Sequence, residues 1–207
     1  MIKNFYDQHI CPHMIDFFMN MNIIKKQRLK VIPNAKGKVL EIGIGSGSNL
    51  EFYDQNKVSK IYALDPHPKL EKMTRKKADE LGIEIEFFPV MAEKIPLEDH
   101  FFDTIVCTYT LCSIEDPIKA LQEIKRVLKP VGQFIFSEHG LAPEENVVRW
   151  QNRLNPIQNL IGGGCNLNRD IPKLIEVGGY KIIELNKGYI PGPKFISYHY
   201  WGHSVPT

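Results

Sequence analysis

The chain has 207 residues, 43% of them hydrophobic, and a formal net charge of +2 from 26 basic and 24 acidic side chains. This size suits one well-packed domain, and the balanced charge argues against nucleic acid as the main partner. Four cysteines without a CxxC pair or a short Cys/His series predict neither disulfides nor a metal site, which favours a reducing, cytoplasmic compartment.

Residues 1–35 are interpreted as a helical lid segment, followed by one compact domain over residues 36–207. The stretch MIKNFYDQHICPHMIDFFMN is interrupted by polar residues and Pro12, so it predicts neither a signal peptide nor a membrane-spanning helix. Peripheral contact with a membrane stays open. Tyr6 could fold over a cationic ligand as part of this lid, although a lone aromatic residue on an amphipathic helix more often packs against a core.

Strand and helix patterns alternate from residue 39 on. Predicted strands cover residues 39–42, 60–65, 83–90, 101–110 and 133–137. Predicted helices cover residues 48–56, which Ser46 or Ser48 can cap, 69–81 and 120–128. After one or two further helices, residues 180–185 and 195–205 predict a closing pair of strands. We therefore expect an α/β fold with a doubly wound, mostly parallel sheet and a final antiparallel strand, and ligands beyond the carboxyl ends of the strands.

The stretch VLEIGIGSG predicts a strand and a glycine turn that suits a ligand containing adenosine. A nicotinamide dinucleotide site has the pattern GxGxxG, but Ser48 occupies the third glycine position here and the glycine comes one residue early. The ExGxGxG pattern of Glu41, Gly43, Gly45 and Gly47 is instead the form used for S-adenosylmethionine. Glu41 can orient the backbone or the ammonium group of the ligand, and the glycines let the backbone pass close beneath it. A nicotinamide oxidoreductase and an ordinary tight turn remain the alternatives.

Asp65 lies 18 residues after Gly47, at the end of the second predicted strand. A carboxylate there can accept hydrogen bonds from both hydroxyls of a ribose. The alternative is a helix cap in an Asp-Pro turn. Either adenosine ligand would use this position, so Asp65 does not distinguish between them.

Four ordered motifs between residues 37 and 140 resemble those of class I S-adenosylmethionine-dependent methyltransferases: EIGIGSG, ALDPHP, MAEKIPLEDHFFDTIVC and LQEIKRVLKPVGQFIFSEHG. TLCSIEDPIKALQEIKRVLKPVG, EHG, GGGCNLNRD and HYWGHSV further resemble the thiol S-methyltransferase-like branch. Members of that branch carry an N-terminal membrane anchor, which we do not carry over because this chain begins almost directly at YDQHICP.

The resemblance implies an enzyme that moves a methyl group from S-adenosylmethionine to a small-molecule acceptor, above all a thiol, and releases S-adenosylhomocysteine. The apolar segments FFMNM and NPIQNLI favour an uncharged, lipophilic acceptor. Methylation of a quinone, a phenol or a phospholipid head group, and a binding module without turnover, stay open as alternatives.

The resemblance also implies roles around the cofactor. Asp65 binds the ribose, and the adenine lies between two groups, Pro66 with His67 and Met91 with Ala92 and Glu93. Thr108 and Leu111 flank the methionine moiety, although Leu111 is equally well explained as a core residue. Many methyltransferases have an Asp where Met91 stands, so we expect backbone groups and apolar contacts to hold the adenine.

His139, at the end of the fifth predicted strand, is best placed to remove a proton from the acceptor, because its unperturbed pKa is about 6.5. A structural histidine bonded to a loop carbonyl is the alternative. Cys165 and Asn166, which follow three glycines, and His199 on the last strand are predicted in the acceptor pocket. Each also has a structural explanation: a small buried thiol, a cap by Asn166 or Asn168 of the next helix, and packing.

Overall fold

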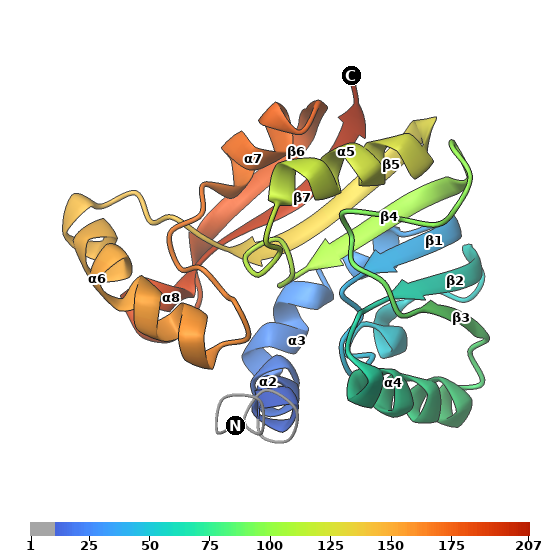
Figure 1. The fold of residues 1–207 in the computed structure, drawn as a ribbon, viewed down its shortest axis with the longest axis horizontal. Helices are drawn as coiled ribbons and strands as arrows, with labels where there is room; N and C mark the ends of the chain where they lie inside the picture. Colours follow the sequence, from blue (N-terminus) through green and yellow to red (C-terminus); the bar gives the residue numbers. More distant parts are fainter. Residues whose placement is uncertain (1–10) are drawn as a thin grey trace.

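The computed structural model describes residues 11–207, which form one seven-stranded sheet with helices packed on it (Figure 1). The strand order is β3-β2-β1-β4-β5-β7-β6. The strands are β1 (Gly37–Ile42), β2 (Val58–Leu64), β3 (Ile85–Phe88), β4 (Phe102–Thr108), β5 (Leu128–His139), β6 (Tyr180–Tyr189) and β7 (Tyr198–Pro206). Strands β1 to β5 are parallel, whereas β7 runs antiparallel to both β5 and β6. The predicted α/β fold with a mostly parallel sheet is confirmed.

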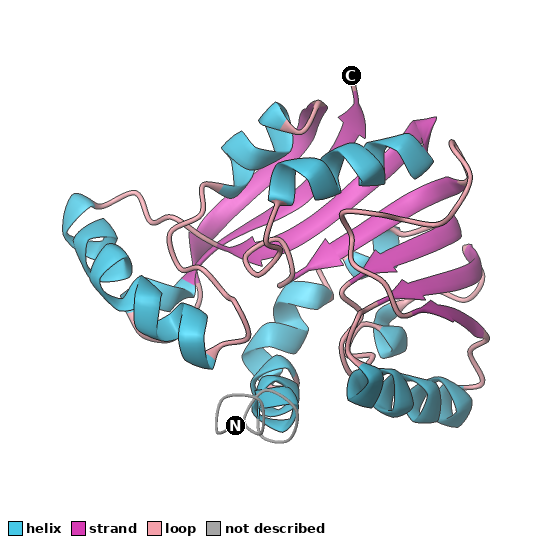
Figure 2. Ribbon diagram, in the orientation of Figure 1, coloured by secondary structure: helices cyan, strands magenta, loops and turns pink. Residues whose placement is uncertain are grey.

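Helices lie on both faces of the sheet (Figure 2). They are α2 (Cys11–Met19), α3 (Asn22–Arg28), α4 (Pro68–Leu81), α5 (Pro117–Val127), α6 (Glu145–Ile161), α7 (Ile171–Val177) and α8 (Lys194–Ser197), with short 3-10 helices η2 (Ile32–Asn34) and η3 (Leu50–Phe52). No helix within residues 11–207 is both long and apolar enough to cross a membrane.

Two hydrophobic cores show that the sheet is doubly wound. Leu40 and Ile42 of β1 pack in one cluster with Leu121 of α5. Val39 of the same strand packs in a second cluster with Ala78 of α4. Because successive side chains of a strand point to opposite faces, β1 is covered on both sides, as expected for the centre of a parallel sheet.

The predicted helix over residues 48–56 is wrong, because turns and the short η3 take its place. Asn49 and Tyr53 bond to the buried carboxylate of Glu41 on β1, and this arrangement holds the segment against the sheet. The hydroxyls of Ser46 and Ser48 pair with each other at 3.2 Å instead of capping a helix.

Other element boundaries also differ from the prediction. Strand β3 is only four residues long, because Pro89 follows Phe88 and cannot donate to a sheet ladder. Helix α5 begins at Pro117, before the predicted start at residue 120. Asp116 caps it by accepting a hydrogen bond from the backbone N–H of Lys119 at 3.0 Å. Strand β5 extends over residues 128–139, beyond the predicted 133–137, and includes Pro130.

Candidate functional site

The sheet order reverses beside β1, where β2 and β4 are its two neighbours. Loops at the carboxyl ends of these strands diverge at such a point and leave room for a ligand. The predicted site residues at the ends of β1, β2, β4 and β5 are Gly43, Asp65, Thr108 and His139. The topology therefore brings the sequence motifs to one edge of the sheet, and this edge is the candidate site.

The glycine turn after β1 has a backbone that favours glycine. Gly43, Gly45 and Gly47 have φ angles of +65°, +61° and +76°. A Cβ at Gly43 would lie 2.4 Å from side-chain atoms of Thr110, whereas a Cβ at Gly45 would meet only the Gly43 carbonyl oxygen at 4.0 Å. The space beside Gly45 is therefore open, with no side chain of residues 11–207 close to it.

Asp65 is bonded to this glycine turn. Its Oδ2 accepts from the backbone N–H of Gly45 at 3.0 Å, and its Oδ1 accepts from that of His67 at 2.9 Å. Burial raises the pKa of Asp65, and the two backbone N–H groups oppose this rise. The turn at Pro66 predicted as the alternative is also present, because Asp65 accepts from the N–H of His67, the residue at the N-cap of α4.

A buried polar network lies beside the turn. Glu41 accepts from Asn49 Nδ2 at 2.8 Å and from the Tyr53 hydroxyl at 2.7 Å, so it orients these side chains. Burial raises the pKa of Glu41 to about 7, although these donors and Arg28 oppose the rise. Arg28 Nη1 donates to the side-chain oxygen of Asn49 and, at 2.8 Å, to the Thr108 hydroxyl.

Sequence reasoning missed Arg28 and Asn49 as members of this site. Arg28 lies on α3 and only 4% of it is exposed. It lies in the basic stretch KKQRLK, which looks like an exposed helix face, and its partner Thr108 is 80 residues away. The signal that could have drawn notice is Asn49, a polar residue two positions after the last glycine of the pattern.

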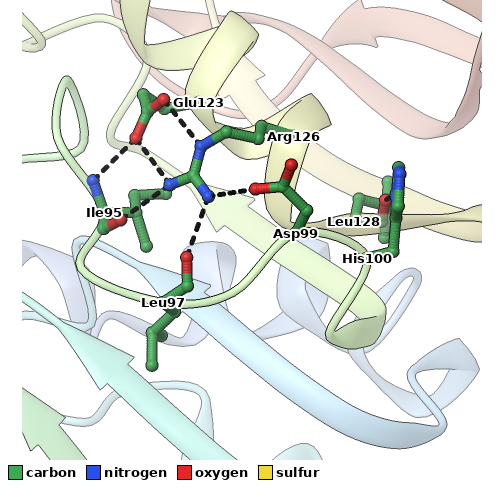
Figure 3. Close-up of polar contacts among 7 residues, drawn as sticks. All are labelled: Ile95, Leu97, Asp99, His100, Glu123, Arg126 and Leu128. Atoms are coloured by element: carbon green, nitrogen blue, oxygen red, sulfur yellow. Dashed lines mark hydrogen bonds and ion pairs between the residues drawn. The ribbon is translucent and has the colours of Figure 1, made fainter.

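The loop after β3 is held by Arg126 of α5 (Figure 3). Its guanidinium donates to the carbonyl oxygens of Leu97 at 2.8 Å and Ile95 at 2.7 Å, and to Asp99 and Glu123 at 2.7 and 2.9 Å. Glu123 also accepts from the backbone N–H of Ile95 at 3.0 Å. One planar cation therefore ties this loop to α5.

The same loop begins with the residues predicted to line the adenine. Met91 is 50% exposed and Ala92 is 5% exposed. Glu93 accepts from the backbone N–H of Asp116 at 3.3 Å, and Pro66 lies exposed after β2. Leu111, predicted beside the methionine moiety, is fully buried in the core cluster under α5.

His139 contacts a cysteine from a distant part of the chain. Its Nε2 lies 3.1 Å from Cys165 Sγ. Cys112, in the loop after β4, completes a group whose ligand atoms all lie within 4.8 Å of one another. Hydrogen bonding to Cys112 lowers the pKa of Cys165. Burial acts to lower the pKa of His139, but the charges of Cys112 and Glu138 outweigh it and raise that pKa.

Asn166 fastens the loop of Cys165 to the loop of Cys112. Its backbone N–H and its side-chain Nδ2 both donate to the Cys112 carbonyl oxygen at 2.9 Å. The predicted cap of the next helix by Asn166 or Asn168 is wrong, because Asp170 caps α7 by accepting from the backbone N–H of Lys173. Asp170 lies closer to the helix start, where the free N–H groups are.

His199 on β7 lies near the same group. Its ring packs edge-on against the ring of Tyr109, with 5.6 Å between the ring centroids. Its Nδ1 lies 3.0 Å from the Ser197 carbonyl oxygen. Burial lowers the pKa of His199 to about 4, so the ring is neutral at pH 7. Tyr109 itself has a φ of +55°. Tyr6, predicted in the lid, lies outside the described residues.

Comparison with known proteins gives relatives over most of the chain. A family model described as a methyltransferase domain matches residues 40–136. Thiol S-methyltransferase TMT1B of Rattus norvegicus is 36% identical over 177 residues, 81% of this chain and 72% of that protein. Thiol S-methyltransferase TMT1A of Homo sapiens is 33% identical over 181 residues, 84% of this chain and 72% of that protein. The crystal structure of a SAM-dependent methyltransferase from Aquifex aeolicus shares the fold, with a TM-score of 0.65, 19% identity, and coverage of 95% of this chain and 98% of that one.

Proposed function

Because this chain belongs to the S-adenosylmethionine-dependent methyltransferases, we propose that its acceptor is a small lipophilic thiol. One observation carries the choice of acceptor: relatives named thiol S-methyltransferases match 81% and 84% of the chain at 36% and 33% identity. Exposed apolar side chains on α2 and α6, such as Phe17 and Ile157, support a lipophilic acceptor. These helices contact each other where Cys11 Sγ donates to the Ile161 carbonyl oxygen.

The donor is proposed to lie across the glycine turn. Its ribose hydroxyls bind Asp65, which the backbone of Gly45 already holds at the turn. Arg28 brings a buried positive charge to this end of the site, which suits the carboxylate of the methionine moiety. The remaining proposed contacts are those inferred from the resemblance: Glu41, Gly43 and Gly47, then Thr108 and Leu111 near the methionine moiety, and Pro66, His67, Met91, Ala92 and Glu93 around the adenine.

A nicotinamide dinucleotide fits this turn less well. Its pyrophosphate binds where a helix begins directly after the glycines, since the free backbone N–H groups of that helix attract phosphate. Here the three-residue η3 is the only helical element between the turn and β2. A donor without phosphate has no need of such a helix end.

Methyl transfer is an in-line displacement at a carbon that the sulfonium has already activated. The acceptor sulfur attacks the methyl carbon, the bond from that carbon to the donor sulfur breaks, and S-adenosylhomocysteine leaves. The protein mainly positions both partners and excludes water. The acceptor thiol must also lose its proton, and His139 is the candidate group for that step, next to Cys165.

The test follows S-adenosylhomocysteine release with acceptor pairs that differ only in the reacting atom. Thiophenol is compared with phenol and hexanethiol with hexanol, beside a quinol and phosphatidylethanolamine vesicles. We expect turnover with the two thiols alone. Turnover confined to phenol, the quinol or the vesicles would refute the thiol as acceptor and identify the compound that reacts as the acceptor class.

The same preparation separates a catalyst from a binding module. S-adenosylmethionine should raise the melting temperature of the protein and NAD should not. Asp65→Ala serves as the control with a damaged donor site. Tight binding of S-adenosylmethionine with no S-adenosylhomocysteine released in the presence of any acceptor would favour a binding module without turnover. Stabilisation by NAD alone would refute S-adenosylmethionine as the donor.

A further inference from the structure

Three thiophilic side chains from separate loops meet beside the candidate site. Cys112 follows β4, His139 ends β5, and Cys165 follows α6. Their ligand atoms lie within 4.8 Å of one another, and His139 Nε2 is 3.1 Å from Cys165 Sγ. Two thiols and an imidazole form a ligand set typical of zinc, and three protein ligands leave the fourth position of the metal open.

The distances suit a tetrahedral ion. Zinc lies about 2.3 Å from sulfur and about 2.0 Å from nitrogen, so ideal geometry separates these two ligand atoms by roughly 3.5 Å. The contact of 3.1 Å between His139 and Cys165 would open by about 0.4 Å to admit the ion. A small side-chain rotation can supply that movement.

The backbone already holds these side chains in place. Asn166 donates twice to the Cys112 carbonyl oxygen, which joins the loops of both cysteines. Arg169 donates to the neighbouring Leu111 carbonyl oxygen. His139 pairs with His199 of β7 in the sheet. Hydrogen bonds between the loops and the pairing of β5 with β7 therefore hold the backbone at all three ligands, as a specific metal site requires.

Charge also favours an ion here. The side chains of Cys112 and His139 are almost fully buried, and 9% of Cys165 is exposed. Two thiolates and one divalent ion sum to zero charge, so the ion and its protein ligands add no net charge to this buried region. Arg169 interacts electrostatically with both cysteines and with the buried Glu138, so a positive side chain lies near the cluster.

We propose that Cys112, His139 and Cys165 bind one zinc ion, whose open position takes the acceptor thiol as a thiolate. The second half of this proposal rests on the proposed function. The acceptor proton passes to water, the metal-bound sulfur attacks the donor methyl carbon, and the electrons of the broken bond remain on the sulfur of S-adenosylhomocysteine. In this arrangement the metal ionises the acceptor, and His139 is a metal ligand in place of the base considered under the proposed function.

The position of the cluster agrees with this role. Thr110, two residues before Cys112, donates to the Gly43 carbonyl oxygen at 3.4 Å. The cluster thus borders the glycine turn proposed for the donor. A metal there would hold the acceptor sulfur next to the donor and keep it ionised, because a coordinated thiol is deprotonated.

The metal site is tested first without turnover. The protein is stripped with a chelator, loaded with zinc and gel-filtered, and its zinc content is measured together with X-ray absorption at the zinc edge. We expect one zinc per chain with sulfur in its first shell. Cobalt loading should give a thiolate-to-cobalt charge-transfer band that Cys165→Ser weakens and Cys11→Ser leaves unchanged.

Two results would overturn the site. One is zinc that is lost on gel filtration or has no sulfur ligand, measured on the unaltered protein. The other is a cobalt spectrum that Cys165→Ser and His139→Asn leave unchanged. Circular dichroism shows whether each variant is folded.

The role of the metal is tested with an aliphatic thiol at several pH values. An aliphatic thiol with the acidity of a cysteine side chain, pKa about 8.5, is roughly 3% ionised at pH 7, so removal of zinc should slow its methylation by up to about 30-fold. The difference should shrink at pH 9, and for thiophenol, which is more acidic. Equal rates at pH 7 with and without zinc would overturn the role of the metal and leave thiol methylation standing. No turnover of any thiol in either form, with the donor bound, would overturn the proposed function and the acceptor role together.

Discussion

The buried carboxyl group of Glu41 makes the stability of this fold depend on pH. Glu41 lies on β1 beside the glycine turn and only 2% of it is exposed. Burial, opposed by Tyr53, Arg28 and Asn49, raises its pKa from 4.5 to about 7. The substitution Glu41→Gln removes the titration while keeping the shape of the side chain.

The sign and size of the effect follow from proton linkage. Between pH 4.5 and 7 the folded chain keeps a proton on Glu41 that the unfolded chain has released. The free energy of unfolding therefore falls as pH rises through this window. A shift of that size corresponds to about 3 kcal/mol at about 1.4 kcal/mol per pH unit. We expect Glu41→Gln to gain about 3 kcal/mol relative to the natural chain between pH 4.5 and pH 7.5.

Urea denaturation of both chains at half-unit pH steps, followed by circular dichroism without cofactor, measures this difference. Glu80→Gln, on the exposed part of α4, controls for the change in total charge. A stability difference that stays flat across the window would refute the reasoning. It would mean that Arg28 keeps Glu41 ionised throughout.

Three further substitutions test the site. Asp65→Ala should weaken S-adenosylmethionine binding by roughly 10- to 100-fold in calorimetry, since a hydrogen bond to a charged group contributes about 1.5–3 kcal/mol; unchanged affinity would contradict the ribose role. Gly43→Ala should destabilise the fold by about 2 kcal/mol, because its Cβ would meet Thr110 at 2.4 Å with φ at +65°. Gly188→Ala, where no atom lies within 4 Å, is the control, and equal urea midpoints for the two would refute the clash. Arg126→Lys should cost about 1–2 kcal/mol and speed hydrogen exchange over residues 91–99, because lysine lacks the planar fork; unaltered exchange would mean that the loop is held by other contacts.

Local patterns in the sequence were enough to predict the layered fold. Apolar runs at strand spacing, separated by helices, led to the parallel sheet because each such element must bury its faces. The spacing of Gly43, Gly45 and Gly47 predicted a tight turn, and all three adopt positive φ. Asp65 was placed correctly because a residue at the end of a parallel strand reaches the same edge as its neighbours. These features depend on residues close together in the chain.

Contacts between distant residues were decided by the tertiary structure. The segment after the glycine turn was predicted as a helix, yet Asn49 and Tyr53 bond to Glu41 instead, since a buried carboxylate must find donors. Arg28 enters the site only because α3 packs against the end of β4. Its position in a basic stretch of sequence gave no sign of burial.

The cluster of Cys112, His139 and Cys165 shows the same limit most clearly. The three residues are 27 and 26 positions apart, so no short spacing links them and the sequence predicted no metal site. They meet because parallel strands β4 and β5 end at one edge of the sheet and the loop after α6 folds back onto it. Residue types and strand ends were determined by the sequence alone, whereas the juxtaposition of side chains from separate loops depends on packing across the whole sheet.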